Sequence, residues 1–288
     1  EPYRRQRQMC IRDSDVPDII DTWNEGKVAD VEGYYENAKI NRVYVDRVHV
    51  KKAFAEYTAA YNADDPKIKL KIDHTYRVAA LCERIAKAAG MCAYDVELAW
   101  LSGMLHDVGR FEQIKRYNTF SDADSVDHAK FGADLLFKDG LISTFLNGMV
   151  KCTGYKPGAL EDRYSSDGVF LYDRLNKSDM EMLELAIRCH NMYRIPQGLN
   201  SREQAFCNVL RDADKVDIFK VNIDTPLEEI YNTTTEELMK SDITDEVLEA
   251  FDEEHCILKA IRRTPADTVI GHVSLAYELV YDESVRIT

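Results

Sequence analysis

The 288-residue sequence predicts an all-α fold. Apolar residues recur every three or four positions along several long segments, which is the spacing of one face of a helix. Capping residues stand at the starts of these segments, and a glycine closes the first of them. Strand-like alternation is limited to the short stretch GVFLYD at 168–173. Because 45% of the residues are hydrophobic, the chain can bury a sizeable core, and one helical domain is the simplest account.

The clearest predicted helix lies in the segment DPKIKLKIDHTYRVAALCERIAKAAG, which runs from Asp65 to Gly90. Asp65 is placed to cap the first turn, a proline follows at the first helical position, and Gly90 ends the helix. Val78 and Leu81 belong to an apolar stripe, and His74 lies on the same stripe. We therefore expect His74 to point toward other helices.

Similar start signals indicate the later helices. These are a helix from about Tyr94 to His106, a helix that begins at Asp127, two helices that follow the capping boxes Ser178/Glu181 and Ser201/Gln204, and a last helix opened by Thr264 and Pro265. The segment from about 148 to 177 is rich in Gly, Tyr, Asp and Ser. We expect a long irregular connection there, such as a lid or an insertion.

The net charge of the chain is −14, which disfavours binding to polymeric nucleic acid because phosphates attract Lys and Arg. Local basic groups can still hold a small phosphorylated ligand. The seven cysteines form no CxxC pairs, and the sequence shows no signal peptide and no long apolar segment. We therefore expect a cytoplasmic protein with reduced thiols, without membrane association and without a cysteine-based metal site.

Residues 1–14 differ in character from the rest of the chain, because the stretch RRQRQMCIRDS at 4–14 resembles a translated sequencing-library adaptor. We expect a non-native segment there and exclude it from the fold. A single domain is then expected to span 15–288, with its core at about 66–222 and its C-terminal helices at 226–282.

Histidines and carboxylates recur on the inward faces or at the ends of the predicted helices. They are His74, His106, Asp107, His128, His190 and one carboxylate of RDADKVD, either Asp212 or Asp214. A single inward histidine is most often a satisfied core residue. Four of them beside a His-Asp pair point to a metal site, since a buried carboxylate is costly unless it is paired or binds metal. Imidazole and carboxylate together suit Zn, Fe, Mn or a similar divalent ion.

This pattern resembles the HD-domain metal-dependent phosphohydrolases. Family members carry a His on one helix, an adjacent His-Asp on the next and an Asp on a later helix. The counterparts here are His74, the HD of HDVGR at 106–107, and the Asp of DADK. In the family the last ligand directly precedes Lys, which favours Asp214 and ranks Asp212 second. The resemblance covers roughly 70–220, is nearest to bacterial HD proteins that carry HDxGRFEQ, and implies an HD-domain helical bundle with its metal site in the core.

Some branches of this superfamily add two histidines and bind two metals. DHAKFGADLL and AIRCHN resemble the segments that supply them, which implies that His128 and His190 hold a second ion. Asp107 would then bridge the two ions, because adjacent side chains diverge by about 100° on a helix. The implied cofactors are two divalent ions, with Fe, Mn, Zn, Co and Mg as candidates. Ions about 3.5–4 Å apart lower the pKa of a water molecule and neutralise phosphoryl oxygens.

Basic and aromatic residues near these ligands are candidates for substrate binding. Lys215, in DADK, resembles a family position that contacts substrate phosphate, and the alternative is a solvated helix lysine. Arg110 and Arg77 can stabilise phosphate or pair with ligand carboxylates, and for Arg77 we favour the structural role. Tyr193 and Arg194, in NMYRIP, can hold a base or a phosphate with their ring and guanidinium.

The resemblance implies a hydrolase that cleaves a phosphate ester or anhydride, with a nucleotide as the favoured substrate. Asp107, Lys215 and Arg110 are the expected catalytic residues. Two alternatives stay open: a mixed-valent di-iron HD oxygenase with the same ligands, and a catalytically silent nucleotide-binding module. Missing ligands would favour the silent module, and in this sequence every ligand has a candidate.

Overall fold

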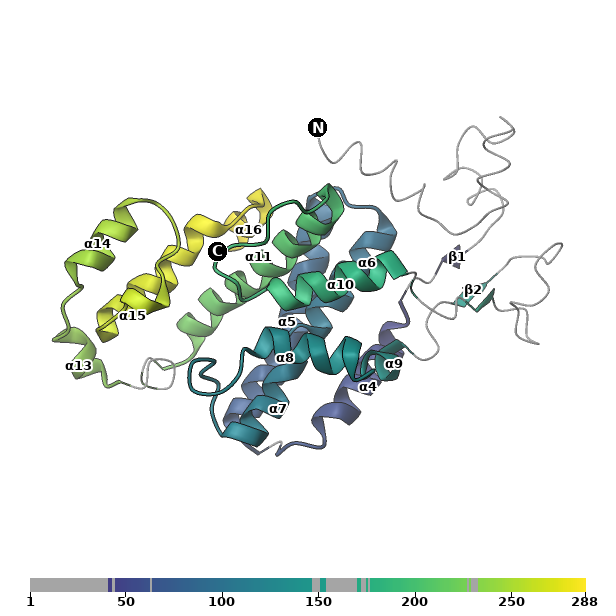
Figure 1. Cartoon of the computed structure of the whole chain (residues 1–288), viewed down its shortest axis with the longest axis horizontal. Helices are drawn as coiled ribbons and strands as arrows, with labels where there is room; N and C mark the ends of the chain where they lie inside the picture. Colours follow the sequence, from purple (N-terminus) through teal and green to yellow (C-terminus); the bar gives the residue numbers. More distant parts are fainter. Residues whose placement is uncertain are drawn as a thin grey trace.

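The structure is a computed structural model that describes residues 41–42, 45–62, 64–146, 151–153, 170–171, 175, 177–226, 228 and 233–288. Helices dominate it (Figure 1). They are α4 (Arg47–Thr58), α5 (Pro66–Ala88), α6 (Ala93–Leu105), α7 (Val108–Tyr117), α8 (His128–Ala133), α9 (Ile142–Leu146), α10 (Lys177–Cys189), α11 (Ser201–Asp224), α13 (Thr235–Met239), α14 (Asp245–Asp252), α15 (Pro265–Val273) and α16 (Asp282–Ile287). Shorter π or 3₁₀ segments are η1 (Asp134–Lys138), η3 (Lys259–Ile261) and η4 (Ser274–Glu278). The all-α prediction is confirmed.

The core of the bundle surrounds α6. Every residue of this helix from Leu98 to Leu105 is buried, as expected of a helix that is covered on all sides. α5, α10 and α11 pack against it (Figure 1). The approach of α5 is close at Gly103, where an added Cβ would lie 2.6 Å from the Cα of Ala79. Glycine at this position therefore lets the two backbones touch just before the HD pair.

The predicted ends of α5 are confirmed. Asp65 accepts a hydrogen bond from the backbone N–H of Lys67 at 2.8 Å, and Pro66 is the first helical residue. Gly90 follows the last turn with a φ of +73°, a conformation that favours glycine. These caps define the helix that carries His74.

Both predicted capping boxes are wrong, by one residue for α11 and by two for α10. α11 begins at Ser201, and its cap is Asn200, whose side chain accepts from the backbone N–H of Glu203 at 3.0 Å. The Glu203 carboxylate accepts in return from the backbone N–H of Asn200 at 2.9 Å. α10 begins at Lys177, so Ser178 lies inside its first turn and not ahead of it. Asparagine and serine cap helices about equally well, so the residue types alone did not select the start.

The predicted last helix ends earlier than expected. Thr264 caps α15 as predicted, but the helix ends at Val273 and passes through η4 to the separate helix α16. The buried carboxylate of Asp212, on α11, accepts hydrogen bonds from the backbone N–H groups of Val280 and Tyr281, each at 3.0 Å. A continuous helix would use those N–H groups itself. The tertiary contact with Asp212 therefore outweighs the helical periodicity of this segment.

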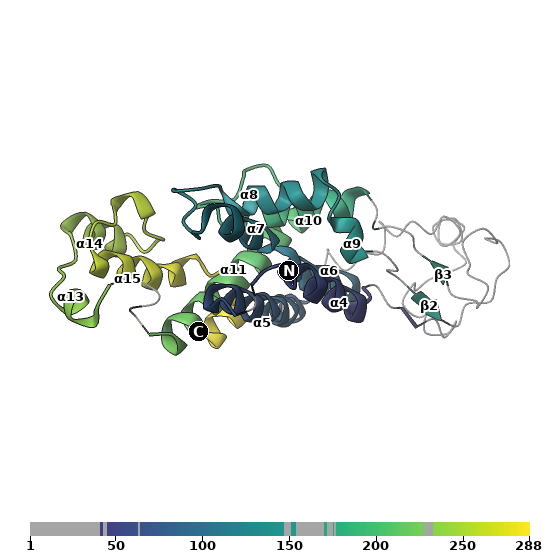
Figure 2. The same ribbon diagram turned by 90° about the horizontal axis from the view of Figure 1, so that it is seen from below.

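Three short antiparallel strands lie beside the bundle, in the order β1 (Asn41–Arg42), β2 (Lys151–Thr153) and β3 (Phe170–Leu171). A strand was predicted at 168–173, and within that range the structure describes only the two residues of β3. Residues 1–14 and most of the predicted connection at 148–177 lie outside the described residues. β2 lies at one end of the molecule, and α13, α14 and α15 lie at the other (Figures 1 and 2). None of the described helices combines the length and the apolar character needed to cross a lipid bilayer.

A buried charge network joins α6, α10 and α11. Arg202, in the first turn of α11, donates from Nη2 to Asp95 Oδ1 on α6 at 2.7 Å. Its Nη1 lies 2.7 Å from Asp179 Oδ1 on α10. Asp95 and Asp179 are 4% and 0% exposed, and the Tyr94 hydroxyl donates to Asp179 as well. The Arg202 guanidinium is thus the counter-charge that two buried carboxylates share.

Replacing Arg202 by methionine is expected to lower the free energy of unfolding by about 3–5 kcal/mol, because two carboxylates would stay buried without this counter-charge. Urea titration followed by circular dichroism measures the change. Arg263→Met is the matched control, since Arg263 pairs with Glu246 and its side chain is 70% exposed. Loss of that surface pair should cost about 1 kcal/mol or less. Equal losses in the two variants would contradict the prediction.

Candidate metal centre

The HD pair occupies the junction between two helices. α6 ends at Leu105, His106 is its C-cap, and Asp107 is the residue before α7. His106 keeps helical dihedral angles, whereas Asp107 leaves them with φ −105° and ψ 14°, so the chain changes direction between the two residues. Both are buried, with exposures of 0% and 2%. The junction therefore holds an imidazole and a carboxylate in the core.

Two glycines bring α8 close to this junction. A Cβ added to Gly109, in the first turn of α7, would lie 2.5 Å from the backbone oxygen of His128 and 2.8 Å from the Cα of Gly132 in α8. Only glycine permits this approach. α10 packs against α8, and His190 follows the last residue of α10. The packing of α7, α8 and α10 thus places His128 and His190 near the HD pair.

Two of the four buried histidines are held by backbone oxygens. His106 donates from Nδ1 to the oxygen of Gly103 at 2.8 Å, and His190 donates from Nδ1 to the oxygen of Ile187 at 2.7 Å. A carbonyl oxygen only accepts, so these Nδ1 atoms carry the ring proton. In the neutral ring the Nε2 atom then keeps a free lone pair, which is the state that binds metal.

The other two histidines are held by carboxylates that were not among the predicted site residues. Nδ1 of His74 lies 2.6 Å from Asp217 Oδ2, and Nδ1 of His128 lies 2.7 Å from Asp122 Oδ2. Arg77 donates to Asp217 through Nε at 2.6 Å and Nη2 at 2.9 Å. This ion pair agrees with the structural role favoured for Arg77. Partners of this kind fix the ring orientation and direct Nε2 inward.

The Nε2 atoms meet in two pairs. His74 Nε2 lies 3.3 Å from His106 Nε2, and His128 Nε2 lies 3.0 Å from His190 Nε2. Burial lowers the pKa of His106 and lowers those of His128 and His190 to about 4. Burial also acts to lower the pKa of His74, but its carboxylate neighbours outweigh that effect and raise it. His128 and His190 are therefore neutral near pH 7, and their Nε2 lone pairs face each other. Facing lone pairs repel unless a cation lies between them, so this pair fits a bound cation.

Asp107 lies between the two pairs. Its Oδ2 is 3.5 Å from Nε2 of His74 and 3.5 Å from Nε2 of His106. Its Oδ1 is 3.5 Å from Nε2 of His128 and 3.8 Å from Nε2 of His190. Burial acts to raise the pKa of Asp107, but nearby cationic groups hold it well below its usual range, so the carboxylate is ionised. Oδ1 is buried and accepts no hydrogen bond from any described residue, which is the environment of a metal ligand.

Asp214, and not Asp212, lies at this centre. Oδ1 of Asp214 is 3.1 Å from Nε2 of His74 and 3.8 Å from Nε2 of His106. Burial acts to raise its pKa, but the hydrogen bond and charge of His74 lower it below the usual range. Asp212 instead binds the backbone that follows η4. The geometry therefore agrees with the order in which the two carboxylates were ranked.

Among the described residues, three groups of side chains could hold a metal ion. They are His74, His106 and Asp214; His106, Asp107 and His190; and Asp122, Asp127 and His128, with ligand atoms within 4.8 Å of one another in each group. A family model, the HD domain, matches residues 72–219. The chain belongs to the HD domain family. Membership indicates a metal-dependent phosphohydrolase as a class, and the convergent nitrogens and buried carboxylate oxygen fit the divalent ions that HD domains bind. No curated protein and no solved structure is similar enough to the chain to count as a match.

The other residues predicted for this HD domain contact different partners. Arg110 Nε lies 3.7 Å from Asp107 Oδ1, and Nη1 donates to Asp122 Oδ1 at 2.9 Å. It thus pairs with carboxylates, which is one of the two roles predicted for it. The Arg194 guanidinium lies 5.5 Å from the centre of the Tyr193 ring, and Arg194 is exposed. Their contact with a base or a phosphate stays a prediction.

Lys215 is not the solvated lysine of the alternative interpretation. Its side chain is 9% exposed, and its ammonium lies 3.8 Å from Glu278 Oε2 in η4. Arg211 approaches the same carboxylate at 3.1 Å. Burial lowers the pKa of Lys215, and among the described residues no acceptor lies within hydrogen-bond geometry of its Nζ. Its contact with substrate phosphate stays a prediction, and its neighbour in this structure is the C-terminal segment.

One cation at the centre was not among the residues predicted from the sequence. Lys71 lies on α5, three residues before His74, and its Nζ donates to Asp107 Oδ2 at 2.7 Å. The side chain is 18% exposed and lies 6.0 Å from the centre of the Phe120 ring. Its spacing from His74 was the available signal, because residues three apart share a helix face.

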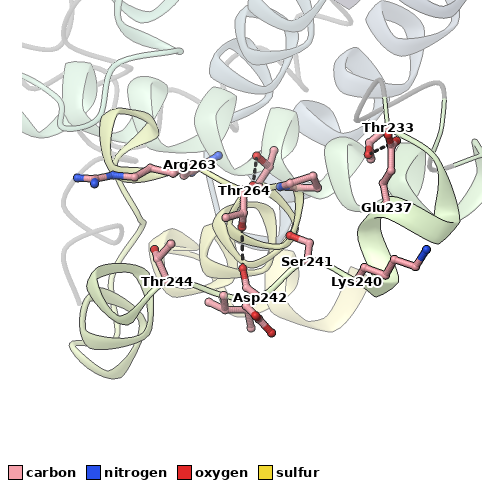
Figure 3. A pocket seen from close by; sticks show the side chains of 12 residues that line it. Thr233, Glu237, Lys240, Ser241, Asp242, Thr244, Arg263 and Thr264 are labelled. Carbon is pink, nitrogen blue, oxygen red and sulfur yellow. Dashed lines mark hydrogen bonds between the residues drawn. The ribbon is translucent and has the colours of Figure 1, made fainter.

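A cavity of about 880 Å³ that is widely open to solvent lies elsewhere in this protein, in the C-terminal helices (Figure 3). All of its lining residues fall between 233 and 268. Two of its cations are already paired, Lys240 with Glu236 and Arg263 with Glu246. Since no HD ligand lines it, this cavity is separate from the candidate metal centre.

Proposed function

We propose that the chain hydrolyses a phosphate ester or anhydride and that its substrates are nucleotides. The observation that carries the proposal is Asp107, whose two oxygens face different pairs of histidine nitrogens at 3.5–3.8 Å. A carboxylate so placed suits a bridge between two divalent ions. We assign His74, His106 and Asp214 to one ion, and His128 and His190 to the other. Fe, Mn, Zn, Co and Mg are the candidate metals.

The ions, when bound, would lower the pKa of a water molecule and neutralise phosphoryl oxygens. The residues of the chain prepare the site for them. Asp217 and Asp122 hold the rings of His74 and His128 through Nδ1 and leave each Nε2 free. Burial of the two histidines and of Asp217 lowers the local dielectric, so charges act more strongly on a reacting phosphoryl group than they would in water.

Positive groups around Asp107 support a phosphorylated substrate. Lys71 and Arg110 approach its two oxygens at 2.7 and 3.7 Å, and ammonium and guanidinium groups are strong phosphate donors. Lys215 and Arg194 are proposed as further phosphate contacts, and Tyr193 as a contact for the base. The net charge of −14 opposes a long polyanion, so we propose a small nucleotide and not a nucleic-acid polymer.

A mixed-valent di-iron oxygenase is the second candidate, because its ligand set would be the same. Lys71 and Arg110 beside the central carboxylate favour the hydrolase, since an anionic phosphoryl group needs such partners. A catalytically silent nucleotide-binding module is disfavoured, because every proposed ligand is present and the four histidines and Asp107 are buried.

Metal-loaded protein is expected to release phosphate or a nucleotide fragment from members of a panel of nucleotides and phosphate esters. Hydrolysis needs no redox change, so Mn²⁺, Co²⁺ or Zn²⁺ should support it equally with and without oxygen. A colorimetric phosphate assay with mass spectrometry of the products measures the reaction, and chelated protein is the inactive control. Activity that requires both iron and dioxygen, and disappears with Zn²⁺, would establish the oxygenase instead.

A further inference from the structure

Lys71 places a positive charge on one particular oxygen of the central carboxylate. Its Nζ donates to Asp107 Oδ2 at 2.7 Å. The same oxygen lies 3.5 Å from Nε2 of His74 and from Nε2 of His106. The ammonium therefore approaches Asp107 on the oxygen that the first proposed ion would also use.

The second oxygen of Asp107 has a different environment. Oδ1 faces His128 and His190, and the nearest guanidinium nitrogen, Arg110 Nε, stays at 3.7 Å. Within the part of the chain that the structure describes, nothing donates a hydrogen bond to Oδ1. Oδ2 of Asp107 is thus hydrogen-bonded to a lysine of the same chain, whereas Oδ1 accepts no hydrogen bond from any described residue.

A divalent ion on Oδ2 would compete with the ammonium for the same lone pairs, and the two positive charges would repel each other. Lys71 can move, because it has a flexible four-carbon stem and its side chain is 18% exposed. A phosphoryl group that joins the ion brings negative charge to the same place. An oxygen of that phosphoryl group can then accept a hydrogen bond from the displaced Lys71 ammonium, which stays at the centre.

We propose that Lys71 exchanges partners: it neutralises Asp107 in the metal-free protein, and it binds a phosphoryl oxygen of the substrate once an ion takes Oδ2. Lys71 is then a substrate-binding residue that also competes with the metal. The phosphoryl half of this inference rests on the proposed function. The competition between Lys71 and a metal ion is inferred from the contacts of Lys71 alone.

Lys71→Met tests the competition in protein freed of metal by a chelator. Calorimetric titration with Mn²⁺ or Zn²⁺ is expected to show about 10-fold tighter binding than in the wild type, because the ion no longer displaces a charge-assisted hydrogen bond. Lys69→Met is the matched control, since Lys69 is exposed on the same helix, and it should bind metal as the wild type does. Weaker or unchanged metal binding in Lys71→Met overturns the proposal.

Inorganic phosphate tests the second half without any turnover. Its affinity for metal-loaded Lys71→Met is expected to fall about 10- to 100-fold, the loss of one charge-assisted hydrogen bond. Lys71→Arg keeps the cation and is expected to restore most of that affinity. Melting temperatures of the metal-free variants check that each is folded, and unchanged phosphate affinity in folded Lys71→Met overturns the exchange. A wild type that hydrolyses no member of the substrate panel would refute the proposed function, whereas these two titrations decide the role of Lys71 independently.

Discussion

Replacing Asp107 by asparagine is expected to reduce kcat/KM by at least about 10³-fold, because both proposed ions lose the charged group between them. One oxygen of Asp107 faces each histidine pair. An amide supplies an oxygen on one side only and carries no charge. Steady-state hydrolysis of the best panel substrate measures the loss, and elemental analysis should show that metal content falls with it.

Asp73→Asn is the control for this experiment. Asp73 lies on α5 beside a proposed ligand but is exposed, so the variant should keep wild-type metal content and turnover. Asparagine has nearly the shape of aspartate, and thermal melting of both metal-free variants separates loss of function from loss of fold. Wild-type metal content together with a tenth or more of wild-type turnover in Asp107→Asn would refute the assignment of Asp107.

Removing either histidine of the second pair is expected to lower metal content from two ions to one per chain. His128 and His190 place their Nε2 atoms 3.0 Å apart beside Asp107 Oδ1, so each alanine variant takes away one of the few proposed ligands of that ion. His74, which belongs to the other pair, is unchanged in both variants. The turnover of each should fall by about 10²-fold or more, because a two-metal centre needs both ions.

Elemental analysis of purified His128→Ala and His190→Ala measures the stoichiometry. His255→Ala is the matched control, because His255 contacts Glu253 in the C-terminal part of the chain and lies outside the candidate centre. If both site variants keep the wild-type metal content, the prediction of a second ion is wrong. The protein would then be a mononuclear enzyme with His74, His106, Asp107 and Asp214 as ligands.

Helix periodicity predicted much of the fold, but it was unreliable at helix ends. Asp65 and Gly90 marked α5 correctly because a proline and a left-handed glycine are nearly unambiguous signals. The start of α11 was wrong by one residue because Asn200 and Ser201 are both good caps. The segment after Val273 left the helix because a buried carboxylate on α11 binds its backbone, and local periodicity carries no information about that contact.

The residues that support the ligands were only partly accessible to sequence reasoning. Lys71 precedes His74 by three residues, and Asp217 follows Asp214 by three residues, so each shares a helix face with a proposed ligand. Spacing could have drawn attention to both. Asp122 precedes the start of α8 and reaches His128 through a loop, where no periodicity places a side chain.

The sequence by itself determined which histidines point inward, because side-chain burial repeats with the helical period and can be read from one segment at a time. It indicated the family through the resemblance of its His, His-Asp and Asp motifs to those of HD-domain proteins. Only the tertiary structure decided between Asp212 and Asp214. Side chains two residues apart diverge by about 200° on a helix, so one meets His74 and the other meets the C-terminal segment. The tertiary structure also set each oxygen of Asp107 against its own histidine pair, because those contacts depend on how helices far apart in the sequence pack together.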